Sequence, residues 1–109
     1  MTQHKELAAG RWQAMSFYEQ MAHVGSEIGR ALNWRAKGKD ITSQRAFERG
    51  LDLLDLTIES ASGFARLKEL TRMRESLVDY FMGKNEFGST DELWRKYFDH
   101  FTYAVRKNY

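Results

Sequence analysis

The sequence of 109 residues contains no cysteine and no proline. The lack of cysteine excludes disulfide bonds, thiolate nucleophiles and thiolate metal sites. No apolar stretch approaches the roughly 20 residues that a membrane-spanning helix needs. The N-terminal residues show no basic segment followed by an apolar run, which is the pattern of a secretory signal. We therefore expect a cytoplasmic protein that does not enter a membrane.

An excess of charge of one sign is also lacking. Seventeen Lys and Arg residues stand against fifteen Asp and Glu residues, so the net charge is only +2. Such a small excess supports nucleic-acid binding only if the basic residues gather on one face. No phosphate-binding glycine loop is present, because neither Gly83 nor Gly88 is followed by Gly-Lys-Ser/Thr. We expect no cofactor.

The sequence does contain the pattern of amphipathic helices. Apolar residues recur at steps of three and four, which predicts helices over residues 11–37, about 43–61, 64–82 and from about 90 to the C-terminus. The residues before Gly10 either continue the first helix or fray. Because the connections are short, we expect one domain over residues 1–109: an all-α, up-down-up-down antiparallel four-helix bundle.

The helix ends and the core follow from the same pattern. We expect Thr42 or Ser43 to cap the second helix, and Ser89 with Glu92 to form a capping box before the fourth. Small residues lie beside the row of apolar residues on the first helix, and they should let another helix approach closely. These small residues are Ala22, Gly25 and Gly29. The predicted inward residues of the first three helices are Met21, Val24, Ile28, Leu32, Phe47, Leu51, Leu54, Ile58, Leu67, Leu70, Leu77, Val78 and Phe81. The fourth helix carries the apolar residues Leu93, Trp94, Tyr97, Phe98, Phe101, Ala104 and Val105.

Two helix faces carry acidic residues at helical spacing. Carboxylates and histidines on facing helices can hold paired metal ions, but that chemistry usually uses Glu-x-x-His on two helices, which this sequence lacks. We therefore expect no metal site, and favour pairing of the acids with Arg30, Arg45 and Arg49. The two faces are Glu19, His23 and Glu27 on the first helix, and Asp52, Asp55 and Glu59 on the second.

A further arginine, Arg74, lies on the apolar stripe of the third helix, where an unpaired guanidinium would be costly. We expect Asp52 or Asp55 to pair with it.

The fourth helix contains Arg95 and His100, with four residues between them. Helical ribonucleases with an R-x4–6-H motif use the arginine to hold the phosphate and the histidine as an acid or base. On a regular helix the two residues lie about 140° apart, so only a dimer interface would bring them together. A metal-independent ribonuclease is thus an alternative function.

Basic residues also gather at one end of the predicted bundle. The expected nucleic-acid-binding residues are Arg30, Arg35, Lys37, Lys39 and Arg45. Trp34 lies at the edge of this cluster and could stack on a base. The alternative is a solvated loop beside a tryptophan that belongs to the core or to an interface.

Aromatic residues are concentrated in the first half of the first helix and in the fourth helix. A bundle this small has difficulty burying all of them, which indicates a protein–protein interface. We therefore expect a homo-oligomer, with a further protein partner also compatible. The residues are Trp12, Phe17, Tyr18, Trp94, Tyr97, Phe98, Phe101, Tyr103 and Tyr109.

The stretch "VGSEIGRALNWRAKGKDITSQRAFERGLDLLDLTIE", about a third of the chain, resembles the small four-helix-bundle proteins encoded in ribosomal RNA intervening sequences. Ser26, Ile28 and the basic run 35–39 carry the resemblance, whereas Gly25, Glu27 and Gly29 depart from the family's Pro-Ser-Asn-Ile-Ala-Glu-Gly signature. The resemblance implies a four-helix bundle, ring-like oligomers and RNA or DNA as a ligand.

The leading interpretation is a non-enzymatic oligomeric accessory or adaptor protein that binds nucleic acid through the basic end of the bundle. The alternatives are the ribonuclease that uses Arg95 and His100, and a module that binds only proteins.

Overall fold

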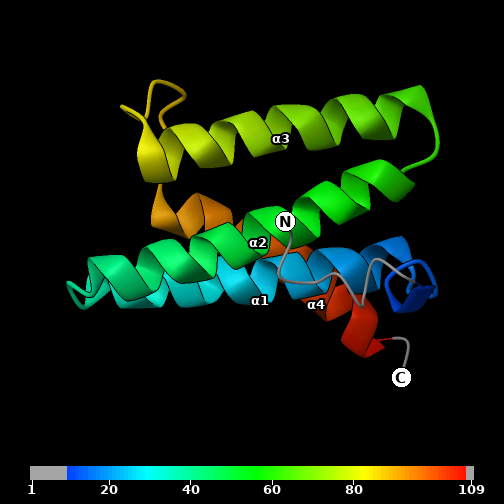
Figure 1. Cartoon of the computed structure of the whole chain (residues 1–109), viewed down its shortest axis with the longest axis horizontal. Helices are drawn as coiled ribbons and strands as arrows, with labels where there is room; N and C mark the ends of the chain where they lie inside the picture. The colour runs from blue at the N-terminus through cyan, green and yellow to red at the C-terminus, as the bar shows by residue number, and fades with distance from the viewer. Residues whose placement is uncertain (1–9, 108–109) are drawn as a thin grey trace.

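The computed structural model describes residues 10–107, and it contains four α-helices and, in that range, no β-strand. The expectation of an all-α protein is therefore confirmed. No helix in the described range is long and apolar enough to span a membrane. The expectations for the residues before Gly10 and for Tyr109 lie outside the described residues. The helices are α1 (Phe17–Ala36), α2 (Asp40–Ser60), α3 (Phe64–Met82) and α4 (Asp91–Lys107) (Figure 1).

Helix α1 begins at Phe17 and not at Arg11 as predicted. Ser16 caps the helix: its hydroxyl accepts a hydrogen bond from the Glu19 N–H at 3.1 Å, and the Glu19 carboxylate accepts one from the Ser16 N–H at 3.1 Å. This capping box satisfies two N–H groups that would otherwise lack a partner, so the helix starts there. The apolar periodicity predicted a start at Arg11, whereas the Ser-x-x-Glu signature at Ser16 and Glu19 indicates the start that the structure shows.

The predicted caps of α2 and α4 were also wrong. Helix α2 begins at Asp40, and the buried Ser43 hydroxyl donates instead to the Ala31 carbonyl of α1 at 2.7 Å. At α4 it is the Thr90 hydroxyl that accepts from the Leu93 N–H at 3.1 Å. Ser89 is engaged elsewhere, because its N–H donates to the Asn85 side chain at 2.8 Å.

Helix α1 lies at the centre of the fold. It packs along α2 and α4, whereas α3 packs mainly on α2 and with fewer contacts. Figure 1 shows α3 on the opposite side of α2 from α1. The apolar core lies between α1, α2 and α4, and α3 adds only three buried residues to it. These core residues are Trp12, Met21, Val24, Ile28, Ala31, Leu32, Ala46, Phe47, Leu53, Leu54, Leu56, Leu70, Met73, Leu77, Trp94, Phe98 and Phe101.

Two glycines allow the close packing around α1. A Cβ atom at Gly25 would lie 2.8 Å from the Phe98 Cβ of α4, and one at Gly50 of α2 would lie 2.8 Å from the Ile28 Cδ1. The predicted role of Gly25 is confirmed. The same prediction was wrong for Gly29, where an added Cβ would meet nothing within 4 Å.

Several residues predicted to face inward are exposed or only partly buried. Leu67 of α3 is 39% exposed, so this prediction was wrong. The cause is the position of α3, which joins α2 through a few contacts such as the stacked rings of Phe47 and Phe81, 4.5 Å apart. The partly buried residues are Leu51, Ile58, Val78 and Phe81 of the predicted set, and Tyr97, Ala104 and Val105 of α4.

The glycine contacts generate a prediction with an internal control. Alanine gains about 1 kcal/mol over glycine inside a helix, but overpacking a core costs about 1–3 kcal/mol. We expect Gly25→Ala to lower the free energy of unfolding, because the Phe98 Cβ can retreat only if α4 moves. Gly29→Ala should raise it by about 1 kcal/mol. Urea denaturation of both variants checks this, and equal shifts would contradict the close approach of α1 and α4.

Candidate functional site

The five basic residues predicted to bind nucleic acid lie on α1, on α2 and at the turn between them. Arg35, Lys37 and Lys39 lie at the turn between α1 and α2, and all three are exposed. Arg30 instead contacts Glu27 within α1, and Arg45 is exposed on α2. Three of the five predicted residues therefore belong to the α1–α2 turn.

Backbone hydrogen bonds hold this turn tightly. The N–H groups of Lys37 and Lys39 donate to the Trp34 carbonyl at 3.1 and 2.9 Å, and the Gly38 N–H donates to the Arg35 carbonyl at 3.0 Å. Gly38 has a φ of +75°, the left-handed conformation that glycine adopts readily at helix C-termini. The turn presents Trp34, which is 37% exposed, with the Lys37 Nζ 5.2 Å from the centre of its ring.

Arg35 has a structural partner on α3. Its guanidinium carbon lies 5.0 Å from the centre of the Tyr80 ring and 5.4 Å from that of Phe81. The Tyr80 hydroxyl in turn donates to the Asp91 carboxylate. Burial, together with the hydrogen bond and charge of Asp91, raises the pKa of Tyr80 above its ordinary value. Arg35 thus helps to hold the end of α3, so a change there would disturb packing as well as charge.

The structure places Arg95 and His100 at different sites along α1. The Arg95 Nη2 donates to the Asn33 side chain at 2.9 Å, near the end of α1. The His100 ring lies 6.2 Å from that of Tyr18, near the start of α1. Within one chain the two residues therefore do not converge on one phosphate.

The surroundings of His100 are mostly aromatic. It lines a hollow of about 300 Å³ with Tyr97 and Arg66 among its neighbours. Burial raises the pKa of Tyr97 to about 12, and the negative charge of Glu69 adds to the effect. The Tyr97 hydroxyl is buried and has no hydrogen-bond partner among the residues described. Tyr97 thus keeps its proton at neutral pH and does not serve as a base.

Glu27 is the most buried acidic residue in the described part of the chain, and two arginines pair with it. One carboxylate oxygen accepts from the Arg30 Nη1, and the other accepts from the Arg49 Nε of α2 at 2.5 Å. The residue is 8% exposed. The preferred interpretation of this acidic face as one paired with arginines is thus confirmed for Arg30 and Arg49. Over residues 10–107, no group of three or more His, Asp or Glu side chains is placed to hold a metal ion.

Of the two partners expected for Arg74, Asp52 and Asp55, the structure pairs it with Asp55. The Arg74 Nε and Nη2 donate to the two Asp55 carboxylate oxygens at 2.7 and 3.4 Å, which links α3 to α2. Their side chains are 37% and 48% exposed, so the pair contributes at most about 1 kcal/mol.

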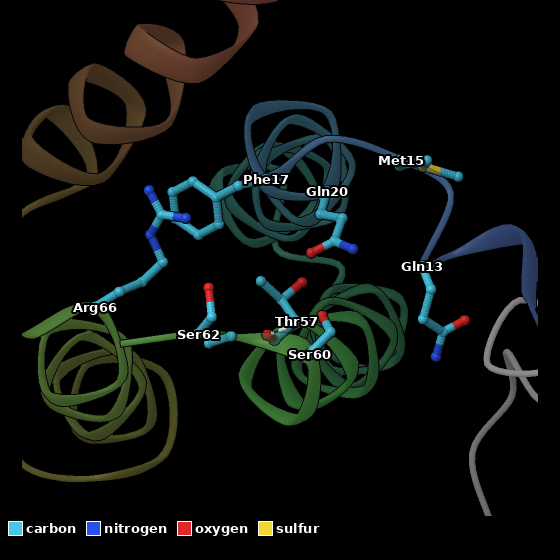
Figure 2. Close-up of a pocket in the computed structure, with 9 residues that line it drawn as sticks. Gln13, Met15, Phe17, Gln20, Thr57, Ser60, Ser62 and Arg66 are labelled. Carbon is cyan, nitrogen blue, oxygen red and sulfur yellow. Dashed lines mark hydrogen bonds between the residues drawn. The ribbon is translucent and has the colours of Figure 1, made fainter. Parts of the chain in front are cut away.

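A small polar pocket lies where the start of α1, the end of α2 and the start of α3 meet (Figure 2). Figure 2 shows Arg66 extending from α3 to the Phe17 ring, and its guanidinium carbon lies 3.9 Å from the ring centre. The Gln20 amide nitrogen donates to the Trp12 carbonyl at 2.9 Å, and the Thr57 hydroxyl donates to the Leu53 carbonyl at 3.1 Å. The volume of about 190 Å³ is below the range of about 300–1,000 Å³ typical of small-molecule sites.

A larger hollow, of about 480 Å³, lies beside Glu27 and its two arginines. Arg11 and Trp12 line it from the segment that precedes α1. The sequence analysis missed their role because it placed both residues inside the first helix. The Ser16–Glu19 capping signature would have shown that they precede it.

The ion pair at Glu27 generates a prediction. Removing one partner of a buried pair leaves the other charge uncompensated, and for a fully buried pair the cost is about 3–5 kcal/mol. Because Arg30 and Arg49 are partly exposed, we expect Glu27→Gln to lower the free energy of unfolding by about 1–3 kcal/mol. Asp55→Asn, the matched change at the exposed pair, should cost less than about 1 kcal/mol. Urea denaturation measures both, and a larger loss at Asp55 would contradict this ranking.

The geometry therefore gives two candidate surfaces, the α1–α2 turn with Trp34 and the hollow beside Glu27. Comparison of the chain with protein-family models, with curated proteins and with solved structures found no match in any of the three. The functional conclusions accordingly depend on the residues themselves.

Proposed function

We propose that this chain is a non-enzymatic, self-associating helical accessory protein that contacts nucleic acid through the α1–α2 turn. The observation that carries the proposal is the exposed Trp34 with Lys37 beside it and Lys39 next in the turn. Aromatic rings that stack on bases, next to cations that contact phosphates, are the usual components of single-strand binding surfaces. The proposal keeps the cytoplasmic location expected from the sequence.

The proposal includes an up-down-up-down antiparallel order of the helices. Contacts between the second half of α1 and the first half of α2, such as Ser43 with Ala31 and Arg49 with Glu27, support it. Contacts between α4 and α1 also support it, because the start of α4 contacts the end of α1 and the reverse. Arg95 contacts Asn33, and Phe101 contacts Phe17. In this arrangement the α1–α2 turn lies at the same end as the start of α4.

Self-association is proposed from the apolar residues that remain exposed. The aromatic argument from the sequence needs revision, because Trp12, Trp94, Phe98 and Phe101 are buried within the chain. Other large apolar side chains are exposed, and several of them lie on α3 or on the segment that follows it. These side chains are Ile41, Phe64, Leu67, Met82, Phe87, Leu93 and Tyr103.

The ribonuclease that would use Arg95 and His100 stays the second candidate. It requires a second copy of the chain to bring the two residues to one phosphate, because within one chain Arg95 is held by Asn33 and His100 lies beside Tyr18. A module that binds only proteins is the third candidate, and the experiment below separates the three.

Fluorescence anisotropy of a labelled single-stranded RNA, measured across salt concentrations, tests the turn. Each lost phosphate contact lowers the slope of log affinity against log salt by about 0.7. We therefore expect Lys37→Glu with Lys39→Glu to lower the slope by about 1.4 and to weaken binding. Trp34→Ala should weaken it by about 1–3 kcal/mol with the slope unchanged. Arg35 is left intact because it packs on α3.

The matched control is Lys68→Glu with Arg72→Glu, the same change of charge on exposed positions of α3. Equal loss of RNA affinity in the two double variants would contradict a site at the turn. If the unmodified protein binds no RNA at low salt, the module that binds only proteins is favoured. RNA recovered in pieces, with cleavage lost in His100→Ala, would favour the ribonuclease. Light scattering on the same samples should give a mass above the 12.8 kDa of one chain if the protein self-associates.

A further inference from the structure

The hollow beside Glu27 lies between the segment before α1, α1 itself and α2. It shares no residue with the α1–α2 turn, and it is lined by Arg11, Trp12, Met15, Arg30 and Arg49, with Glu27 among them. Its volume of about 480 Å³ falls within the range of about 300–1,000 Å³ typical of small-molecule sites. We propose that it binds a small organic phosphate, with the phosphate on the arginines and the rest of the molecule against the apolar wall.

The arginines carry the first part of the argument. Glu27 accepts from one nitrogen of Arg30 and from one nitrogen of Arg49. A guanidinium has five N–H donors, so most donors of both residues remain, and they reach no other acceptor within residues 10–107. The Glu27 carboxylate thus orients two planar guanidinium groups while it accepts from only one N–H group of each. Such groups bind phosphate oxygens through paired hydrogen bonds.

The charge of the lining favours an anion. Three arginines line the hollow, whereas Glu27 is the one carboxylate among its lining residues. Because the surrounding walls are protein rather than water, an excess of positive charge in a concave site attracts anions more strongly than the same charge on a flat surface.

Trp12 gives a second, independent observation. Its side chain is fully buried, and its indole Nε1–H has no hydrogen-bond partner in the described part of the chain. Buried donors without a partner are rare in folded proteins, and an acceptor supplied by another molecule is one explanation of such a donor. An ester or phosphate oxygen would be such an acceptor for the Trp12 Nε1–H.

The remaining lining residues indicate that the ligand is larger than phosphate alone. Met15 and Leu53 provide an apolar wall, and the Trp12 ring lies 6.0 Å from the ring of His23. An apolar or aromatic group esterified to the phosphate would cover this wall, whereas inorganic phosphate would leave it in contact with water. The chemical class is therefore a phosphate monoester with an apolar or aromatic part.

The test follows the three tryptophan indole signals in ¹H–¹⁵N spectra of the full chain, assigned through triple-resonance experiments. The probes are adenosine 5′-monophosphate, inorganic phosphate and adenosine. We expect the monophosphate to shift the Trp12 signal to saturation, inorganic phosphate to shift it at higher concentration only, and adenosine to leave it in place. Arg11→Gln should lower the affinity for the monophosphate by about ten-fold. Arg11 is exposed and takes no part in the Glu27 ion pair, so the fold should tolerate the change.

The control is Arg72→Gln, an exposed arginine of α3 outside this hollow, which should leave the affinity unchanged. Equal affinities of the two variants, an equal shift with adenosine, or no shift of Trp12 at millimolar monophosphate would each overturn the inference. A shift of Trp34 alone would place the probe at the α1–α2 turn and would also overturn it. Apart from a Trp34 shift, which would support nucleotide contact at the turn, these results leave RNA binding through Lys37 and Lys39 untouched, so the two proposals fail separately.

Discussion

The close approach of α1 to its two neighbours governs much of the structure. Phe98 fits against α1 only because residue 25 has no side chain, and Ile28 fits against α2 only because residue 50 has none. With the helices this close, Glu27 lies between α1 and α2 and is largely withdrawn from water. A carboxylate in that position needs positive partners, and Arg30 with Arg49 supplies them. The hollow that we assign to a phosphate ester lies beside this pair.

Helix α3 stands apart from that arrangement. It is joined to α2 by the stacked rings of Phe47 and Phe81 and by the partly exposed pair of Arg74 with Asp55, and to the end of α1 by Arg35. These contacts are few and partly solvated, so they stabilise α3 less than the apolar core stabilises the other helices. The apolar side chains on and after α3 are exposed for the same reason. Helix α3 buries only three residues, so its other apolar side chains remain in contact with water.

The sequence predicted those features that depend on local pattern. Four helices, the bounds of α3 and the buried stripe of α1 follow from apolar periodicity, and the partner of Arg74 follows from the cost of an unpaired charge on an apolar stripe. The start of α1 was missed although Ser16 and Glu19 signalled it. Thr90 and Ser89 compete for the same capping role, and only the loop geometry around Asn85 decides between them.

The rest depends on how the helices pack. The exposure of Leu67 results from the position of α3, which no local pattern reveals. The sequence predicted the pairing of Glu27 with Arg30 and Arg49, but the burial of Glu27 depends on how α1 and α2 pack. The hollow combines Arg11 from before α1 with Arg49 from α2, residues that only the tertiary structure brings together. Thus the fold class was accessible from sequence, whereas the more enclosed of the two candidate sites was not.

We expect α1, α2 and α4 to unfold as one cooperative core, to which α3 is attached by fewer contacts. Native-state amide hydrogen exchange at increasing urea tests this directly. Interior amides of α1, α2 and α4 should exchange only through global unfolding, whereas those of α3 should exchange through an opening of lower free energy. Exchange of α3 at the same free energy as α1 would contradict it, because the four helices would then unfold as a single unit.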